Sequence, residues 1–330
     1  MKYASLGRTN IEVSAICMGC WGLVGGDYWG EQQDSDSIAA IHAALEAGVN
    51  FFDTAEAYGN GFSEELLGRA LKGRRGKVVI ASKVSADHLG PADVRSACEG
   101  SLRRLGTDYL DLYQVHWPSR TVPLADSMGA LEELRQQGKV RAVGVSNFGP
   151  RDMDDLAAAG RAESNQLPYS LLWRAIEFEI VPRCMELEVS ILSYSSLMQG
   201  LLAGKFAKVE DVPAPRARTR HFDAATHEQA RHGEAGCETE TFAAIGRIRE
   251  IAEECGQSMA DVSIAWLLAQ PGMTSVIAGM RTPEQVRRNA RAAESELSPD
   301  ILDELTASTE EVKQVLGSNA DMWQSESRMR

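Results

Sequence analysis

The sequence predicts an α/β protein folded as a (β/α)8 TIM barrel, and three observations support this prediction. Eight short apolar runs alternate with amphipathic stretches that have the 3.6-residue period of helices. The runs are nearly continuous, as is typical of parallel strands buried on both faces. Most of the polar residues that end these runs recur about every 30 residues, the length of one βα unit. Eight such units in one direction close into a barrel.

The predicted barrel strands are rich in apolar and β-branched residues. They span Ala15–Met18, Asn50–Asp53, Val78–Ser82, Leu110–His116, Ala142–Ser146, Glu163–Gln166, Ile191–Ser195 and Ser275–Ala278. Helices between them begin at acidic, serine or proline residues and stop at glycines. The clearest run from Asp34 to Gly48, from Ser63 to Gly73, from Pro91, and over Ala125–Gln137 before Gly138.

Three segments lie outside this repeat. Met1–Glu12 resembles a β-hairpin that plugs the bottom of the barrel, and Ser298–Leu316 predicts an extra C-terminal helix, followed by a tail to Arg330. Val209–Glu238 is rich in charge, proline and histidine, which predicts a long loop after the seventh strand. No linker or low-complexity tract divides the chain, so we expect residues 1–330 to form a single domain.

Composition excludes several classes of function. The 34 Lys and Arg residues and 47 Asp and Glu residues give a net charge of −13, which argues against a nucleic-acid or anionic-membrane partner. No apolar run of about 18 residues predicts a membrane span, and the N-terminus does not resemble a signal peptide. Six scattered cysteines suit a reducing compartment. We therefore expect a cytoplasmic protein, either a monomer or a small homo-oligomer.

Three ionisable residues end successive strands. Asp53 ends the second strand, Lys83 follows the third and His116 ends the fourth, so all three meet at the C-terminal rim, where barrel active sites lie. Placing charged groups there costs stability, which indicates a function. The structural alternative is an Asp53–Lys83 ion pair that merely closes the barrel mouth.

These residue types suit the reduction of a carbonyl group. Tyr58 follows Asp53 by five residues, and its loop brings the phenol over the rim. The Lys83 ammonium, held by Asp53, lowers the pKa of a neighbouring phenol, so that Tyr58 becomes an acid for a developing alkoxide. His116 donates a hydrogen bond to the same carbonyl oxygen. The hydride has to come from a cofactor.

At this point the chain resembles the aldo-keto reductases along nearly its whole length. Asp53, Tyr58, Lys83 and His116 match that family's catalytic tetrad, and His116-Trp117-Pro118 matches its fourth-strand motif. The resemblance implies an oxidoreductase that transfers a hydride between a nicotinamide and an aldehyde, a ketone or the corresponding alcohol, including sugars. It implies NADP(H) as the preferred cofactor and NAD(H) as the alternative.

The resemblance also implies the residues that bind the cofactor. They are Trp21, Gly22, Asp53, Ser146, Asn147, Gln166, Tyr194, Ser195, Leu197, Gln199, Gly200, Lys205, Arg218, Gly279, Arg281, Gln285, Arg288 and Asn289. Among them Arg281 is expected to pair with the 2′-phosphate, beside the N-terminus of a helix opened by Thr282. Arg218 is either a clamp on the cofactor or a solvated charge. No G-x-G-x-x-G motif supports a Rossmann site.

Two positions depart from the family's usual pattern. Arg288 stands where many relatives carry an acidic residue that contacts adenine, and Ser196 stands where a proline is common. The first difference bears on the preference for NADP(H). The second bears on the stiffness of the loop.

The predicted substrate pocket is aromatic. Its residues are Trp21, Trp29, Tyr58, His116, Trp117 and Trp323. Such walls stack on the apolar face of a sugar or hold an aromatic aldehyde. Trp266 lies in an apolar helical stretch and is expected in the core.

No metal site is predicted. His221, His227 and His232 lack the spacing of a helical metal pair and are interpreted as solvated loop histidines. Cys17-Met18-Gly19-Cys20 is a C-x-x-C without a second cysteine pair, which leaves a redox or zinc role as the less favoured alternative.

Two other functions stay open at this stage. Some aldo-keto reductase relatives are cofactor-sensing regulatory subunits of ion channels, and these also carry the tetrad. A lyase that forms a Schiff base on Lys83 is the other alternative. Asp53 argues against it, because it keeps Lys83 protonated.

Overall fold

A closed barrel of eight parallel strands forms the centre of the computed structural model, which describes all residues 1–330. The strand order around the barrel is β10-β3-β4-β5-β6-β7-β8-β9. The strands are β3 (Ile16–Gly19), β4 (Phe51–Asp53), β5 (Val79–Val84), β6 (Leu110–Val115), β7 (Val140–Ser146), β8 (Ser164–Pro168), β9 (Ser190–Tyr194) and β10 (Met273–Gly279). Each coincides with one predicted strand to within two residues at either end. The predicted barrel is therefore confirmed.

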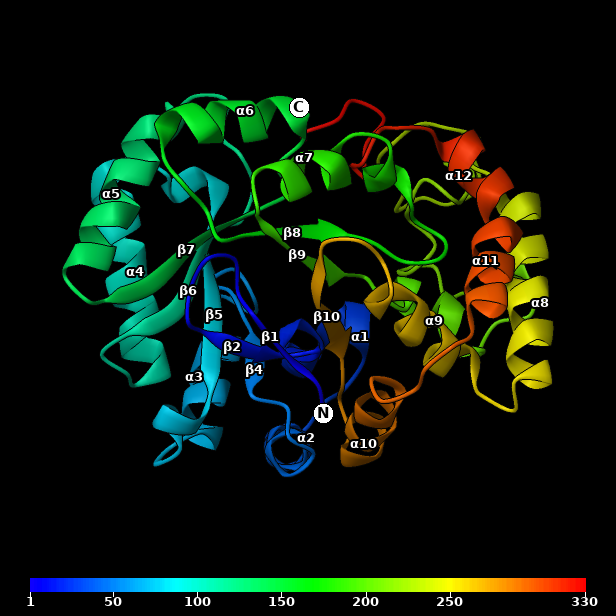
Figure 1. Cartoon of the computed structure of the whole chain (residues 1–330), viewed down its shortest axis with the longest axis horizontal. Helices are drawn as coiled ribbons and strands as arrows, with labels where there is room; N and C mark the ends of the chain where they lie inside the picture. The colour runs from blue at the N-terminus through cyan, green and yellow to red at the C-terminus, as the bar shows by residue number, and fades with distance from the viewer.

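Helices form the outer layer, one after nearly every strand (Figure 1). They are α2 (Asp34–Glu46), α3 (Phe62–Ala70), α4 (Pro91–Leu105), α5 (Leu124–Gln136), α6 (Pro150–Ala159), α7 (Ile180–Glu186), α9 (Met259–Leu268) and α10 (Pro283–Ala292). Polar side chains cap the later ones: the hydroxyl of Ser258 accepts from the amide of Asp261, and that of Thr282 accepts from the amide of Gln285. None of the helices is long and apolar enough to cross a bilayer.

The N-terminal hairpin closes one end of the barrel, as the sequence predicts. Strand β1 (Tyr3–Ser5) pairs antiparallel with β2 (Glu12–Ser14) in front of the barrel in Figure 1. Leu6, Ile11 and Val13 are buried and belong to one apolar cluster with barrel-interior side chains such as Phe51 and Leu112. The bottom half of the interior is therefore filled, which leaves the carboxyl ends of the strands as the open end.

The C-terminal region contains two helices, so the prediction of a single helix over Ser298–Leu316 is wrong. Helices α11 (Pro299–Ser308) and α12 (Glu310–Leu316) meet at Thr309, which has non-helical dihedrals. The Arg174 guanidinium donates to the carbonyl of Thr306 at 2.8 Å and to the hydroxyl of Thr309 at 3.1 Å. These bonds satisfy groups that a continuous helix would have used internally, which explains the break.

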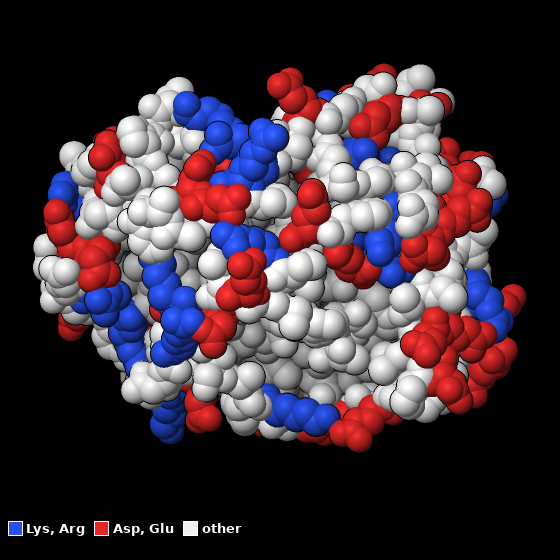
Figure 2. Space-filling view, turned by 45° about the horizontal axis from the view of Figure 1, so that its top comes forward, with Lys and Arg blue, Asp and Glu red and all other residues white.

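Helix α8 (Glu238–Glu254) packs against α11 and α12 on one side of the barrel (Figure 1). Acidic side chains gather on this side of the molecule (Figure 2). Helices α8 and α11 contribute Asp and Glu residues to this part of the surface.

The long loop after β9 exists as predicted, and between β9 and α8, which begins at Glu238, the chain forms only two 3-10 segments, Met198–Ala203 and Val209–Asp211. The prediction that the histidines of this loop are solvated is wrong for His221 and His232, which are buried. His221 Nε2 donates to the carbonyl of Leu172 at 2.7 Å, and its Nδ1 accepts from the hydroxyl of Thr219 at 3.0 Å. The loop therefore folds inward as part of the core.

The same loop is tied to the C-terminal tail by Arg220, which is 7% exposed. Its guanidinium donates to the carbonyls of Leu316 and Asn319, each at 3.0 Å, and pairs with Glu234 at 2.8 Å. Its backbone amide donates to the carbonyl of Met322. Loop and tail thus form one packed unit above the open end of the barrel, although about 100 residues separate them.

Burial of His221 predicts a pH-dependent stability. Burial lowers the pKa of His221 from 6.5 to about 4. Between pH 6.5 and about 4, His221 therefore binds a proton in the unfolded chain but not in the folded chain. The free energy of unfolding falls as the pH drops through this range. Between pH 7 and pH 5 this residue is expected to remove about 2 kcal/mol from the free energy of unfolding.

The variant His221→Gln retains a donor and an acceptor but does not titrate. Urea unfolding measures the free energy of unfolding at pH 7 and at pH 5. Between these two pH values, His221→Gln should lose about 2 kcal/mol less of this free energy than the wild type does. Equal losses in the two proteins would contradict this account of the buried imidazole.

Candidate active site

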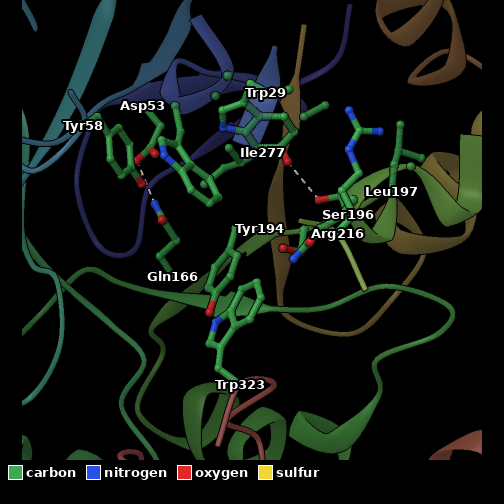
Figure 3. Close-up of a pocket in the computed structure, with 18 of the residues that line it drawn as sticks. Trp29, Asp53, Tyr58, Gln166, Tyr194, Ser196, Leu197, Arg216, Ile277 and Trp323 are labelled. Carbon is green, nitrogen blue, oxygen red and sulfur yellow. Dashed lines mark hydrogen bonds between the residues drawn. The ribbon is translucent and has the colours of Figure 1, made fainter. Parts of the chain in front are cut away.

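A cavity of about 470 Å³ opens at the carboxyl ends of the barrel strands, above the apolar cluster. It is lined by the predicted substrate-pocket residues and by all of the predicted cofactor residues except Asn289. Asp53, Tyr58 and Gln166 face one another at one side of it, and Trp323 lies beside Tyr194 at another (Figure 3). The structure therefore brings together residues from both ends of the chain.

Lys83 and Asp53 form a buried ion pair at the base of this cavity. Strands β4 and β5 place their carboxyl ends side by side, and both side chains are buried. Lys83 Nζ donates to Asp53 Oδ1 at 2.6 Å, to the carbonyl of Thr54 at 2.9 Å and to the Tyr58 hydroxyl at 3.2 Å. Burial disfavours the ammonium, but Asp53 and Tyr58 outweigh this effect, so the pKa of Lys83 is raised. Lys83 therefore carries its positive charge.

Tyr58 and Asp53 of this group border the cavity, whereas Lys83 does not. Burial raises the pKa of Tyr58 above 10, while Lys83 opposes this shift. The expected net lowering of the phenol pKa is thus wrong for this structure, because loss of hydration outweighs the ammonium. The phenol remains protonated at neutral pH and has a proton to give.

His116 faces Tyr58 across the cavity, with the two rings edge-on and their centroids 5.7 Å apart. Burial, and then the charge of Lys83, lowers the pKa of His116 to about 3. The imidazole is therefore neutral, with one N–H donor. A neutral donor orients a carbonyl oxygen without adding a proton that competes with that of Tyr58.

The second oxygen of Asp53 contacts two amides. Gln166 Nε2 donates to Asp53 Oδ2 at 2.7 Å, and Gln114 Nε2 lies 3.4 Å from the same oxygen (Figure 3 shows the Gln166 bond). Gln166 thus holds the tetrad carboxylate in this structure. The sequence analysis missed Gln114, although its position two residues before His116 indicates the same face of β6.

The ends of β7, β8 and β9 are joined by a chain of polar contacts. Tyr194 donates to Asn147 Oδ1 at 2.9 Å, and Asn147 Nδ2 donates to the carbonyl of His116 and to Ser146 Oγ, each at 3.0 Å. Ser146 Oγ in turn donates to the carbonyl of Gln166 at 3.0 Å. These groups, predicted from the sequence to surround a nicotinamide, therefore form one rigid surface.

The segment after β9 forms a tight loop beside β10. Met198, Gln199 and Gly200 all have positive φ. Ser196 Oγ donates to the carbonyl of Ile277 at 3.0 Å (Figure 3), so the serine that replaces the family's usual proline binds the loop to β10. A Cβ added at Gly200 would lie 3.3 Å from Arg216 Nη1, so Arg216 lies against this loop.

Arg281 lines the cavity, but the N–H groups of its guanidinium already donate hydrogen bonds within the protein. Its guanidinium donates to Gln32 Oε1 at 2.8 Å and to the carbonyls of Trp29, Gly30 and Glu31 in the loop that contains helix α1 (Gly26–Trp29). Burial, and then the neighbouring Arg216, lowers the pKa of Arg281. A phosphate would therefore replace backbone carbonyls as its partner.

Asn289 departs from the predicted arrangement. It is buried, does not border the cavity, and both polar atoms of its amide lack a partner. Its position one turn inside α10, behind Gln285, explains why the cavity does not reach it.

The aromatic wall is built from two distant parts of the chain. Trp21 stacks on Tyr28 with ring centroids 5.2 Å apart and on Tyr58 at 6.1 Å, and Trp29 meets Trp21 edge-on at 5.1 Å. Trp323 comes from the tail. Tyr28 packs on Trp21 and Trp29 without bordering the cavity itself. Trp266 is buried in the core, as expected.

Arg218 is not a freely solvated charge. Its guanidinium lies 4.3 Å from the ring centroid of Tyr28 and 4.8 Å from that of Trp323, and its Nε is buried without a partner. These contacts argue against a freely solvated charge at Arg218.

The cavity is strongly basic, although the chain is acidic. Its cationic side chains are Lys205, Arg216, Arg218, Arg231, Arg281, Arg288 and Arg328. The single acidic residue of the lining, Asp53, is neutralised by Lys83. Arg216, Arg231 and Arg328 were missed by the sequence analysis because they come from the long loop and the tail. The lining fits an anionic molecule.

The C-x-x-C cysteines are buried free thiols on and just after β3. Burial, and then Asp53, raises the pKa of both Cys17 and Cys20. Since the thiolate is the form that reacts and binds metals, this environment disfavours a redox or zinc role.

Comparisons with known proteins agree with this geometry. The model of the aldo/keto reductase family matches residues 15–310. An aldo-keto reductase of Bacillus subtilis (strain 168) is 36% identical, and the match covers 87% of each chain. An NADH-specific methylglyoxal reductase of Escherichia coli (strain K12) is 31% identical, over 90% of this chain and 95% of its own.

Solved structures are similar too. The crystal structure of an aldo-keto reductase from Klebsiella pneumoniae in complex with NADPH aligns with a TM-score of 0.73 and 30% identity, covering 93% of this chain and 95% of its own. The glycerol dehydrogenase of Gluconobacter oxydans aligns with a TM-score of 0.79 and 30% identity, covering 94% of each chain. The barrel, the cavity and these matches together show that this chain belongs to the aldo/keto reductase family of oxidoreductases.

Proposed function

We propose that this protein is an NADP(H)-dependent carbonyl reductase that also runs in the direction of alcohol oxidation, with Tyr58 as the general acid and base. The observation that carries the proposal is the chain of contacts from Asp53 through Lys83 to Tyr58, which ends at the base of a basic, aromatic cavity. A small molecule with an aldehyde or keto group fits this arrangement.

The residues present fit a phosphorylated nicotinamide cofactor. Lys205 and Arg216 belong to the loop after β9, whereas Arg281 precedes the N-cap of α10 and Arg288 lies within that helix. They supply positive charge along one side of the cavity, where phosphates would be held. When bound, the nicotinamide supplies the hydride for reduction or accepts it in oxidation.

Ser146, Asn147 and Gln166 are suited to hold the carboxamide of that nicotinamide, and Tyr194 to stack on its ring. Asn147 has both a donor and an acceptor at the cavity wall. Gln166 keeps its side-chain oxygen available while its nitrogen holds Asp53. Orientation of the ring follows from these groups because strands β7 to β9 hold them rigidly.

Proton transfer is assigned to Tyr58. His116 and Tyr58 border the same cavity with their rings 5.7 Å apart, so we assign both donors to one carbonyl oxygen, which they polarise. As the oxygen becomes an alkoxide, a much stronger base than a phenolate, it takes the Tyr58 proton. Lys83 stabilises the resulting phenolate, and Asp53 holds Lys83, so these two act as positioning residues.

The structure gives physical reasons against the lyase alternative. Lys83 is buried, does not border the cavity, and has a raised pKa. A Schiff base requires a neutral amine that can reach the carbonyl carbon. Both requirements are opposed by the contacts of Lys83.

NADP(H) is the proposed cofactor and NAD(H) the alternative. Support comes from Arg281 and Arg288, two cations near the N-terminus of α10, and from the NADPH complex of the relative from Klebsiella pneumoniae. The NADH-specific relative from Escherichia coli shows that the family also contains the other preference. The aromatic wall supports substrates with an apolar face, such as sugars or aromatic aldehydes.

The first test concerns the acid. Tyr58→Phe keeps the ring and its stacking but removes the proton donor. We expect NADPH consumption with an aldehyde to fall by at least about 100-fold. NADPH binding, followed by fluorescence titration, should persist. Turnover like that of the wild type would remove Tyr58 from the mechanism.

The second test concerns the phosphate. Arg281→Ala removes the cation proposed to pair with the 2′-phosphate and should weaken NADPH binding by roughly 1.5–3 kcal/mol while leaving NADH binding nearly unchanged. Arg287→Ala, on the exposed face of the same helix, is the matched control. Equal losses for both cofactors would show that Arg281 does not recognise the phosphate.

The third test concerns Lys83. Lys83→Met removes the charge and leaves Asp53 buried without a partner, so the double variant Asp53→Asn/Lys83→Met serves as a second protein if the first unfolds. We expect Lys83→Met, the double variant and Lys83→Arg each to lose most of the carbonyl-reducing activity. Borohydride treatment of the wild type with an aldehyde should leave Lys83 unmodified. A substrate adduct on Lys83 in the mass spectrum would contradict hydride transfer and favour the lyase.

A further inference from the structure

The cations of the cavity fall into two groups. The first group lies near Gly200 and α10: Arg216 lies against Gly200 and beside Arg281, Arg288 belongs to α10, and Lys205 follows the Gly200 turn. The other group consists of Arg218, which contacts Trp323 of the tail, Arg328, which belongs to the tail, and Arg231, which precedes a residue bonded to the tail. Only Arg328 has a carboxylate partner, Asp321 at 2.7 Å. Six cations in one cavity of an acidic protein thus lack an ion pair.

The first group is sufficient for the cofactor. NADPH carries about four negative charges at neutral pH, because a phosphate monoester has about 1.5 to 2 and the diphosphate bridge adds about two. The four cations of the first group balance this charge. Arg218 and Arg231 therefore remain without an anion to neutralise.

The position of Arg218 indicates what it binds. Its guanidinium lies between the rings of Tyr28 and Trp323, with its Nε buried and unpartnered. Contacts with two rings restrain the guanidinium, whose geometry matches that of a planar, bidentate anion. Arg231 follows on the tail side, since the carbonyl of the next residue, His232, accepts a hydrogen bond from Ser325.

This group lies on the substrate side of the cavity. Tyr58 stacks on Trp21, Trp21 on Tyr28, and Tyr28 on Arg218, so two rings separate the proton donor from the guanidinium. At the other wall, Arg328 covers Trp117 at 3.8 Å from its ring centroid. Trp117 and Trp323 border the same cavity as Tyr58, so a molecule with its carbonyl at Tyr58 and a spacer along either ring can reach Arg328 or Arg218.

We infer that the carbonyl substrate carries an anionic group, a carboxylate or a phosphate, at the end opposite to its carbonyl, and that Arg218 recognises this group. This inference rests on the proposed reductase function and specifies its substrate class. Arg231 adds positive charge at the entrance, and Arg328, paired with Asp321, shapes the wall. The anion takes no part in hydride or proton transfer and serves binding alone.

Two matched pairs of aldehydes test the inference with NADPH saturating: 4-carboxybenzaldehyde against 4-methylbenzaldehyde, and glyceraldehyde 3-phosphate against glyceraldehyde. The wild type is expected to prefer the anionic member of at least one pair by about tenfold or more in kcat/KM. The pair that shows the preference identifies the anion as carboxylate or phosphate. Equal kcat/KM within both pairs would overturn the inference.

Variants of Arg218 assign the preference to this residue. Arg218→Gln should lower the anionic-to-neutral ratio roughly 10- to 100-fold, and Arg218→Lys should retain part of it. Arg103→Gln, an equal change of charge on the exposed face of α4, should keep the wild-type ratio. The Kd of NADPH should change less than about threefold in Arg218→Gln. A loss of NADPH affinity as large as the loss of the ratio would make Arg218 a cofactor ligand and overturn the inference.

Binding without turnover separates this inference from the reductase proposal. The alcohols 4-(hydroxymethyl)benzoate and glycerol 3-phosphate, titrated calorimetrically into the protein saturated with NADPH, have no oxidant and cannot react. At least one should bind the wild type and bind Arg218→Gln about tenfold or more weakly. If no aldehyde is reduced but this binding is seen, the reductase proposal fails and the anion site stands. If neither alcohol binds, the anion site is wrong.

Discussion

The buried ion pair between Asp53 and Lys83 is the interaction on which the rest of the site depends. Two charges at the base of a cavity lose their hydration, and only close geometry with further hydrogen bonds offsets that cost. Here the ammonium has three oxygen acceptors and the carboxylate receives bonds from Lys83 and Gln166. This network sets the position of Tyr58 and links the carboxyl ends of four strands, β4, β5, β6 and β8. Removal of one member would leave the others buried without partners.

The barrel can carry this polar network because its two ends differ. At the bottom, the hairpin β1–β2 and inward-facing apolar side chains fill the interior and exclude water. At the top, the same strands end in polar residues instead of continuing the apolar layers. Stability is thus concentrated at one end and chemistry at the other, the division expected of this architecture.

Above the open end of the barrel, the long loop and the C-terminal tail pack directly against each other. Arg220 alone joins the loop to two tail carbonyls and to Glu234. Consequently, Arg218 and Trp323 meet in one wall although they are far apart in sequence. The basic character of the cavity arises from this assembly, because most of its additional cations come from the loop and the tail.

The sequence by itself determined the architecture and which polar residues share the rim of the barrel. Continuous apolar runs at regular intervals specify parallel barrel strands, since a two-faced burial leaves few other solutions. The residues that end those runs, Asp53, Lys83 and His116, necessarily share a rim, so their meeting follows from topology. Tyr58 was predicted to join them because it follows Asp53 by only five residues in the sequence.

Tertiary structure alone decided the rest. The burial of His221, the break at Thr309, the amide of Gln114 on Asp53, and the entry of Arg216, Arg231 and Arg328 into the cavity depend on contacts across long separations. The same holds for the raised pKa of Tyr58, where the degree of burial outweighs a neighbouring charge. Periodicity predicts which face of a strand or helix is buried, but an irregular loop has no period. Its placement depends on the partners that satisfy its backbone and charges, and these partners come together only in the folded chain.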